Sequence, residues 1–183
     1  MGMPDDSVEV AIQGGMAYVR VHGRGTFKIA PGLKQFGMAA IEQDCKRLLI
    51  EMGDCLGMDS TFMGVLAGLA VSLKKKDGEI VLRHLSEKNV FLVKILGLSH
   101  LVSVEQGGAI DPIMPAGARV LETGADKNTI TQTMITAHET LVEVSPDNIV
   151  KFKDVLSFLK EDLKRVPGQG GAEKSALNNN PVA

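Results

Sequence analysis

The chain has 183 residues, of which 44% are hydrophobic and 23% are charged, and its formal net charge at pH 7 is −2. This composition is typical of a globular domain that buries its own core, with room for an appendage. The small net charge argues against nucleic-acid binding, which usually requires a basic domain or stripe. The one basic run, Lys74–Lys76, stands at the end of a predicted helix, where cations complement the helix dipole.

No segment of the sequence suggests a membrane or an oxidising compartment. No apolar run reaches the about 18 residues that a membrane-spanning helix requires, and residues 1–6 lack the basic and apolar regions of a signal peptide. The two cysteines, Cys45 and Cys55, lack the spacing of a metal site. We therefore expect a cytoplasmic protein with reduced thiols, no metal and no other cofactor.

The first elements predicted are a β-hairpin, a helix and a buried strand. Residues 8–12 and 16–22 alternate between apolar and polar, and Gly14–Gly15 supplies the turn between them. A helix is expected to begin near Pro31, since proline suits the first helical turn. Residues 48–52 form a continuous apolar run, which favours a central strand buried on both faces. The inner face of the helix is predicted to carry Leu33, Phe36, Ala40, Ile41 and Cys45.

A tight turn containing Asp59 and Ser60 is predicted to follow this strand and to open a second helix. Small residues in that helix should let it pack closely on the sheet, and Asp77–Gly78 should end it, with Gly78 as the left-handed C-cap. The apolar side of the helix is predicted to consist of Phe62, Val65, Leu66, Leu69, Ala70 and Leu73.

The rest of the chain is predicted to hold two strands, a short helix and two longer helices. Strands are expected at 79–84 and 101–105, and the helix between them should start at Ser86 and stop at Gly97. A further short strand is possible at 118–122. The last two helices carry apolar residues at helical spacing from Ile130 to Val144 and from Ile149 to Val166, and Ser145-Pro146-Asp147 is typical of a helix start.

These elements predict an α/β fold with a mixed, mostly parallel sheet, because strands and helices alternate along the chain. We expect a domain core at 1–105 and a loop or linker at 106–125. C-terminal helices should occupy 126–166, the first of them completing the domain. Residues 167–183 are too polar to pack and should form a disordered tail.

The Asp59–Ser60 turn is the most informative motif. A serine at the start of a helix lies beside unpaired backbone N–H groups and the positive end of the helix dipole, which suits attachment or recognition of a phosphate. Capping of the helix by Asp59 or Ser60 alone is the simpler reading of the same residues.

In this setting the chain resembles the STAS domain family, which includes bacterial anti-sigma factor antagonists and the tails of sulfate transporters. The resemblance extends over about residues 7 to 105, and the helix near 129–143 would be the family's last helix. Members commonly carry Asp-Ser-Ser/Thr-Gly-Leu-Gly at the turn. The matching segments are Leu48–Met52, Met58–Gly64, Glu79–Leu85, Val93–Leu98 and Leu101–Val102.

The resemblance implies a regulatory protein-binding module rather than an enzyme. In stand-alone antagonists of the family, the serine after the aspartate is phosphorylated by an anti-sigma factor that is a serine kinase of the histidine-kinase-like ATPase class, and a serine phosphatase reverses the change. Carried over, this makes Ser60 the phosphoacceptor, Thr61 an alternative acceptor and Asp59 the acidic neighbour. The partner would bind at Asp59, Ser60, Thr61, Phe62 and Met63.

Phe62 departs from the family pattern, which has glycine at this position. Its side chain could obstruct a kinase of the usual type, form an apolar anchor for another partner together with Met63, or pack inward on the first helical turn.

Two other functions remain open from the sequence. The chain could be an unphosphorylated scaffold, or a binding subunit for a small ligand or a lipid-transport assembly. An enzyme is less well supported, because His22, His84, His100 and His138 show no ligand spacing and Ser60 has no histidine near it in sequence. The apolar seam of the last helix could pack on the domain or on its sister helix, form a homodimer, or dock to a partner.

Overall fold

The computed structural model describes residues 6–108, 114–115, 117–121 and 123–165. The strands are β1 (Ser7–Gln13), β2 (Met16–Gly25), β3 (Arg47–Glu51), β4 (Cys55–Met58), β5 (Glu79–Arg83), β6 (Val102–Glu105) and β7 (Arg119–Val120). The helices are α1 (Ala30–Glu42), α2 (Ser60–Lys74), α3 (Glu87–Ile95), α4 (Lys127–Val144) and α5 (Asn148–Lys164).

The strands form one mixed, mostly parallel sheet in the order β6-β5-β3-β2-β1-β7. β2, β3, β5 and β6 pair in parallel, whereas β1 is antiparallel to both β2 and β7. The predicted α/β class and the predicted hairpin of β1 and β2 are therefore confirmed. The alternating side chains of β1 and β2 and the continuous apolar run of β3 account for these pairings, since each buries an apolar face.

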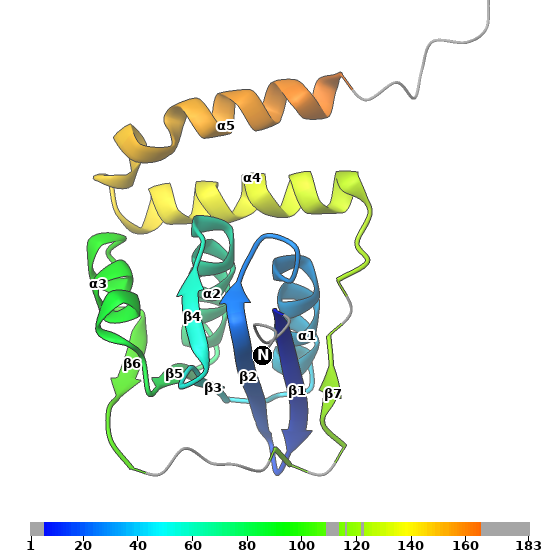
Figure 1. The fold of residues 1–183 in the computed structure, drawn as a ribbon, viewed down its shortest axis with the longest axis vertical. Helices are drawn as coiled ribbons and strands as arrows, with labels where there is room; N and C mark the ends of the chain where they lie inside the picture. The colour runs from blue at the N-terminus through cyan, green and yellow to red at the C-terminus, as the bar shows by residue number, and fades with distance from the viewer. Residues whose placement is uncertain (1–5, 109–113, 116, 122, 166–183) are drawn as a thin grey trace, which may run out of the picture.

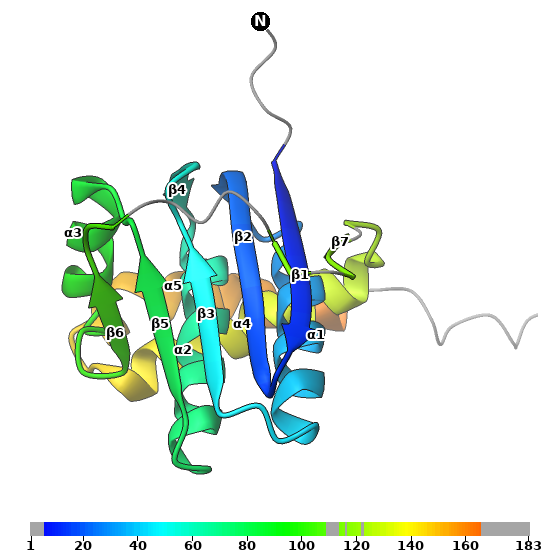
Figure 2. The ribbon, with the colours of Figure 1, turned by 90° about the horizontal axis from the view of Figure 1, so that it is seen from below.

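The helices lie on one face of the sheet. α1 and α2 cover the sheet, α4 runs across α2, and α5 lies on α4, so the elements are stacked in successive layers (Figure 1). After a turn of 90°, seen from below, the sheet lies in front of α1, α2, α4 and α5, and none of the described helices covers this face (Figure 2). The residues predicted for the inner face of the first helix are all buried, but Cys45 lies beyond the end of α1 at Glu42. The predicted apolar side of α2 is buried as well.

β4 was not predicted, because its sequence was interpreted as a turn. The strand pairs in parallel with the last residues of β2, Gly23 to Gly25, beyond the part of β2 that contacts β3. Cys55 is buried and Leu56 is exposed, so the alternation of a strand is present but only over four residues. The strand was missed because Gly23 and Gly25 of β2 and Gly57 of β4 are residues that usually indicate a turn.

Two predicted helix ends differ from the structure. At the end of α2 the left-handed residue is Asp77, with φ of 56°, and not Gly78. Gly78 is required for close approach instead, since a Cβ there would lie 2.5 Å from the carbonyl oxygen of Lys46. Ser145 ends α4, and Asp147 precedes α5 without the predicted side-chain cap.

The small residues of α2 approach another helix as well as the sheet. A Cβ on Gly64 would lie 2.4 Å from the carbonyl oxygen of Ala137, so the backbones of α2 and α4 cross in close contact there. Asn148, which is fully buried, holds the junction of α4 and α5 by donating to the carbonyl oxygens of Leu96 at 3.0 Å and Leu141 at 2.8 Å.

In the described part of the chain, none of the helices has the length and hydropathy needed to cross a membrane. The predicted tail at 167–183 lies outside the described residues.

Both cysteines should resist alkylation while the protein is folded. Burial raises the pKa of the Cys45 thiol, and the Asp44 carboxylate adds to this, while burial also raises the pKa of the Cys55 thiol. A raised pKa leaves less of the reactive thiolate at neutral pH. We therefore expect iodoacetamide to modify neither thiol at neutral pH, modification to increase as the pH rises, and complete modification in urea, as followed by mass spectrometry. Rapid labelling at neutral pH without denaturant would contradict this.

Candidate functional site

The site is built where β4 ends and α2 begins. Ser60 is the first residue of α2, and Asp59 is its N-cap in an extended conformation with φ of −90° and ψ of 170°. Ser60 is half-buried, and the start of α2 lies directly beneath α4 (Figure 1). The sequence pattern therefore predicted the position of the serine correctly.

Asp59 joins two segments at this point. One carboxylate oxygen accepts the backbone N–H of Phe62 at 2.8 Å, which caps α2. The other oxygen accepts the backbone N–H of Phe27 at 2.7 Å, in the loop between β2 and α1. Asp59 therefore fixes the start of α2 relative to that loop, and both of its oxygens are already occupied.

The Ser60 hydroxyl is hydrogen-bonded to a histidine from α4. The distance from Ser60 Oγ to His138 Nε2 is 2.8 Å, and His138 Nδ1 lies 2.7 Å from the carbonyl oxygen of Met134. A carbonyl oxygen only accepts, so Nδ1 donates to Met134. When the ring carries this one hydrogen, Nε2 accepts and the serine hydroxyl donates. His138 is 2% exposed, so this bond is made inside the protein.

A serine paired with a histidine can lose its proton to the ring, which is the first requirement of a nucleophile. The second requirement, donors for a developing oxyanion, is poorly met here. The N–H of Phe62 is held by the Asp59 carboxylate, and the N–H of Met63 donates to the Asp59 carbonyl at 3.1 Å. The Asp59 charge would also repel an oxyanion that develops beside it.

Three residues of the predicted partner-binding set lie in the core. Phe62 is 0% exposed, Met63 1% and Thr61 3%. The interpretation of Phe62 and Met63 as a surface anchor is wrong in this fold, and the inward alternative for Phe62 is correct. Thr61 is likewise too buried to act as an alternative acceptor. A Cβ on Gly25 would lie 2.8 Å from the Phe62 ring, so a glycine on β2 provides the space for it.

Other exposed apolar residues surround the site, and the sequence analysis did not identify them. Leu56 on β4 is 56% exposed and Phe27 is 37% exposed. A surface hollow of about 370 Å³ lies beside Asp59, with Arg24 and Lys28 in its lining. The sequence contained little indication that Leu56 and Phe27 are exposed together, because each is an isolated apolar residue outside the predicted helices and strands.

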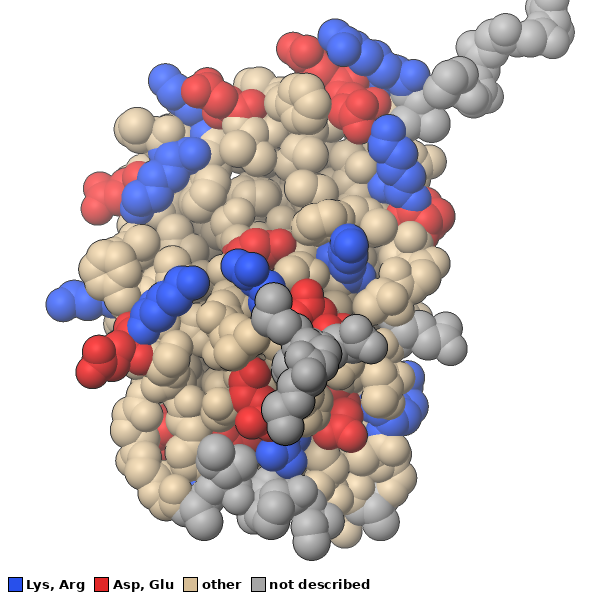
Figure 3. Space-filling model, viewed as in Figure 1, with Lys and Arg blue, Asp and Glu red and all other residues tan. Residues whose placement is uncertain are grey.

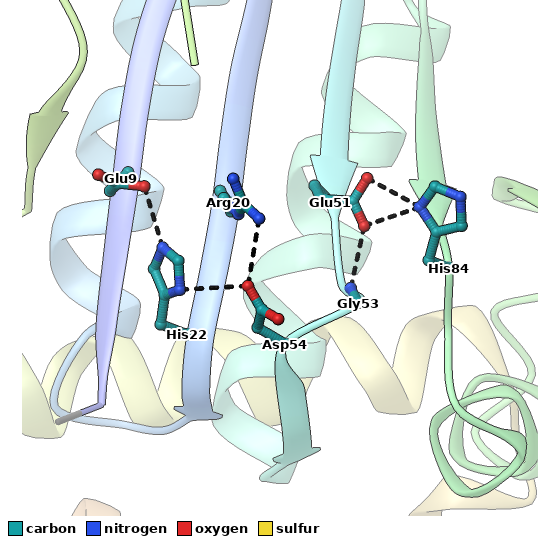
Figure 4. A network of polar contacts seen from close by, with 7 residues as sticks. All are labelled: Glu9, Arg20, His22, Glu51, Gly53, Asp54 and His84. Carbon is teal, nitrogen blue, oxygen red and sulfur yellow. Dashed lines mark hydrogen bonds and ion pairs between the residues drawn. The ribbon is translucent and has the colours of Figure 1, made fainter. Parts of the chain in front are cut away.

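A second polar cluster lies on the helix-free face of the sheet (Figure 4). His22 Nε2 is 2.9 Å from a Glu9 carboxylate oxygen, and Asp54 lies 3.3 Å from Arg20. The register of the strands sets this pattern, since alternate residues face the same side.

The other half of this cluster pairs His84 with Glu51, at 2.8 Å from Nδ1 to a carboxylate oxygen. Glu51 is 4% exposed and also accepts the N–H of Gly53 at 3.0 Å. His84 and the backbone N–H of Gly53 therefore satisfy the buried carboxylate of Glu51. Within the described residues no group of three or more His, Cys, Asp or Glu side chains is placed to hold a metal ion.

On the face drawn in Figure 3, the described residues form no basic stripe. Acidic and basic side chains alternate over it among larger areas of uncharged residues. This face therefore does not have the charge pattern by which proteins bind a nucleic-acid backbone.

Comparison with known proteins identifies the family. The family model of the STAS domain matches residues 7–108. The chain therefore belongs to the STAS domain family. A search of curated proteins gave no significant match.

The chain is also similar to solved structures of anti-sigma factor antagonists. A putative antagonist from Thermotoga maritima is 15% identical, with 54% of this chain and 85% of that chain covered and a TM-score of 0.49. The antagonist SpoIIAA in its unphosphorylated form is 16% identical, with 54% and 86% covered and a TM-score of 0.49. The Bacillus cell fate determinant SpoIIAA in its phosphorylated form is 16% identical, with 54% and 89% covered and a TM-score of 0.47.

Proposed function

We propose that this protein is a non-catalytic regulatory module of the cytoplasm that binds a protein partner and is switched by phosphorylation of Ser60. The observation that carries the proposal is the position of the Ser60 hydroxyl. It is half-buried at the first residue of α2. The exposed Leu56 stands four residues before it on β4, and the exposed Phe27 donates its backbone N–H to Asp59. A partner that covers these two residues would also cover Ser60.

The electrostatics of the site support a switch of binding and not of folding. A phosphate adds about −1.5 to −2 charges beside Asp59. The helix N-terminus offsets part of the repulsion, by about 0.3–1 kcal/mol, and Arg24 and Lys28 line the neighbouring hollow. In a protein interface the same charge is buried without a partner, which costs several times more. The phosphorylated protein should therefore stay folded and release its partner.

The partner chemistry follows from the family resemblance. We propose a serine kinase of the histidine-kinase-like ATPase class that is also an anti-sigma factor, with a serine phosphatase as the opposing enzyme. Thr61, at 3% exposure, is not the acceptor in this proposal. A homodimer through α5 is a further possibility of this module, since Val150 and Phe158 on α5 are 76% and 67% exposed.

One observation favours the second candidate, an unphosphorylated scaffold. The Ser60 hydroxyl already has a buried acceptor in His138, so the serine also has a structural role. In a scaffold the exposed residues Leu56 and Phe27 would still bind a partner, but Ser60 would never be modified.

Intact-mass spectrometry of protein purified from its native host tests the proposal. We expect a species that is heavier by one phosphoryl group, mapped to Ser60 and absent from Ser60→Ala. Partner capture by Ser60→Asp should fall at least tenfold, because about 1.4 kcal/mol of interface free energy is a tenfold change in affinity.

The matched control for the docking surface compares two exposed apolar residues. Leu56→Asp should abolish capture of the partner, whereas Val120→Asp on β7, which is equally exposed at 56%, should leave it unchanged. If Ser60 were unmodified in the native protein and Ser60→Asp bound the partner as well as the parent does, the phosphorylation switch would be excluded. The unphosphorylated scaffold would then be the remaining candidate.

A further inference from the structure

One side chain connects the first residue of α2 with both C-terminal helices. His138 of α4 accepts the Ser60 hydroxyl at 2.8 Å and meets the ring of Phe152 on α5 edge to face, with ring centroids 4.9 Å apart. Ser60 and His138 are 78 positions apart in the sequence. A chemical change at Ser60 therefore alters a contact of His138, the residue that packs against both α2 and α5.

The bond to Ser60 matters because His138 is enclosed. At 2% exposure its Nε2 cannot exchange a lost partner for bulk water. A buried acceptor without a donor carries the full cost of its desolvation. Removing the serine hydroxyl should therefore weaken the contact of α4 with α2 more than the loss of an exposed hydrogen bond would.

Phosphorylation would remove the hydrogen that Ser60 donates to His138. The Ser60 oxygen and the imidazole nitrogen are in direct hydrogen-bond contact, at 2.8 Å. The ester oxygen of a phosphoserine carries no hydrogen, so the bond that Ser60 donates to His138 is lost.

We propose that the Ser60 hydroxyl is a latch that fastens the α4–α5 pair (residues 127–164) to the start of α2 through His138, and that a phosphoryl group on Ser60 opens it. The regulatory consequence rests on the function proposed above, whereas the latch itself does not require a kinase. The α4–α5 junction stays in place because Asn148 holds it independently, by its bonds to Leu96 and Leu141.

Hydrogen exchange of the full chain, followed by mass spectrometry, tests the latch. Ser60→Ala should accelerate amide exchange in α4 and α5 about tenfold, the effect of one buried acceptor that loses its donor. Protein with phosphoserine incorporated at position 60 during synthesis should show acceleration at least as large. Ser72→Ala, at the other end of α2, is the matched control and should change nothing in α4 or α5.

A double-mutant cycle separates a latch from a general loss of packing. His138→Phe keeps a ring against Phe152 but cannot accept a hydrogen bond. In that background Ser60→Ala should have no further effect on exchange in α4. His138→Gln provides the same comparison if the phenylalanine variant does not fold.

Unchanged exchange in Ser60→Ala, or effects of Ser60→Ala and His138→Phe that simply add, would overturn the latch. Unchanged or slower exchange with phosphoserine would overturn its opening by phosphate. None of these results depends on a partner, so a latch that fails leaves the phosphorylation proposal to be decided by the mass of the native protein.

Discussion

Replacing Phe62 by alanine should lower the free energy of unfolding by about 3–5 kcal/mol, the range observed for deletion of a buried aromatic ring. The side chain is 0% exposed and stands on the first turn of α2, two residues after Ser60. Its loss would leave a cavity beneath the candidate site. Urea denaturation followed by circular dichroism should show a lower midpoint with an unchanged slope.

The control for this substitution is Leu56→Ala on the neighbouring strand. Leu56 is 56% exposed, so its truncation should change stability by no more than about 0.5 kcal/mol. Equal effects of the two substitutions would mean that the Phe62 ring does not belong to the core.

A second comparison tests the pairing of Phe62 with Gly25. Alanine at position 25 would place its Cβ 2.8 Å from the ring, so Gly25→Ala should destabilise the native protein. In the Phe62→Ala background the same substitution should cost much less, because the obstructing ring is gone. This coupling explains how the chain accommodates phenylalanine where the family commonly has glycine.

The sequence was sufficient for the elements whose patterns are local. The alternation in β1 and β2, the apolar run of β3 and the serine cap of α3 each appear within a few consecutive residues, and the structure contains all of them. β4 was missed because its four residues include a glycine and follow a turn, so its strand character comes from pairing with β2.

The candidate site could be predicted only in part, for the same physical reason. The Asp59 cap and the Ser60 position depend on a local motif, and they were predicted. The contacts that determine what the site can do are long-range: Gly25 lies against Phe62, and His138 binds Ser60. A single sequence carries no local signal for such pairs, so Phe62 was left between three interpretations and His138 was grouped with histidines of no assigned role.

The structure also explains why residue 64, four positions after Ser60 in the motif, is glycine. Gly64 does not serve the turn, because it lies inside α2. Its role is to let the backbones of α2 and α4 meet, since an added Cβ would lie 2.4 Å from the carbonyl oxygen of Ala137 and 2.7 Å from its Cβ. The same glycine therefore determines how closely His138, the next residue of α4, approaches Ser60.

Gly64→Ala should consequently destabilise the protein by about 3 kcal/mol, the upper part of the usual range for overpacking. The obstructing atoms belong to the backbone of α4 and cannot rotate away, so α4 must move and lose its contact with α2. Thermal unfolding should occur at a lower temperature, and amide exchange in α4 should accelerate together with it.

Gly68→Ala, one turn further along α2, is the matched control and should have the opposite sign. A Cβ there meets only Thr140 Oγ1, at 3.9 Å, which is ordinary contact. Alanine within a helix is favoured over glycine by about 0.5–1 kcal/mol, so this variant should be slightly more stable than the parent. If the two alanine variants unfolded alike, the close crossing of α2 and α4 would not be the constraint that fixes Gly64, and the approach of His138 to Ser60 would need another cause.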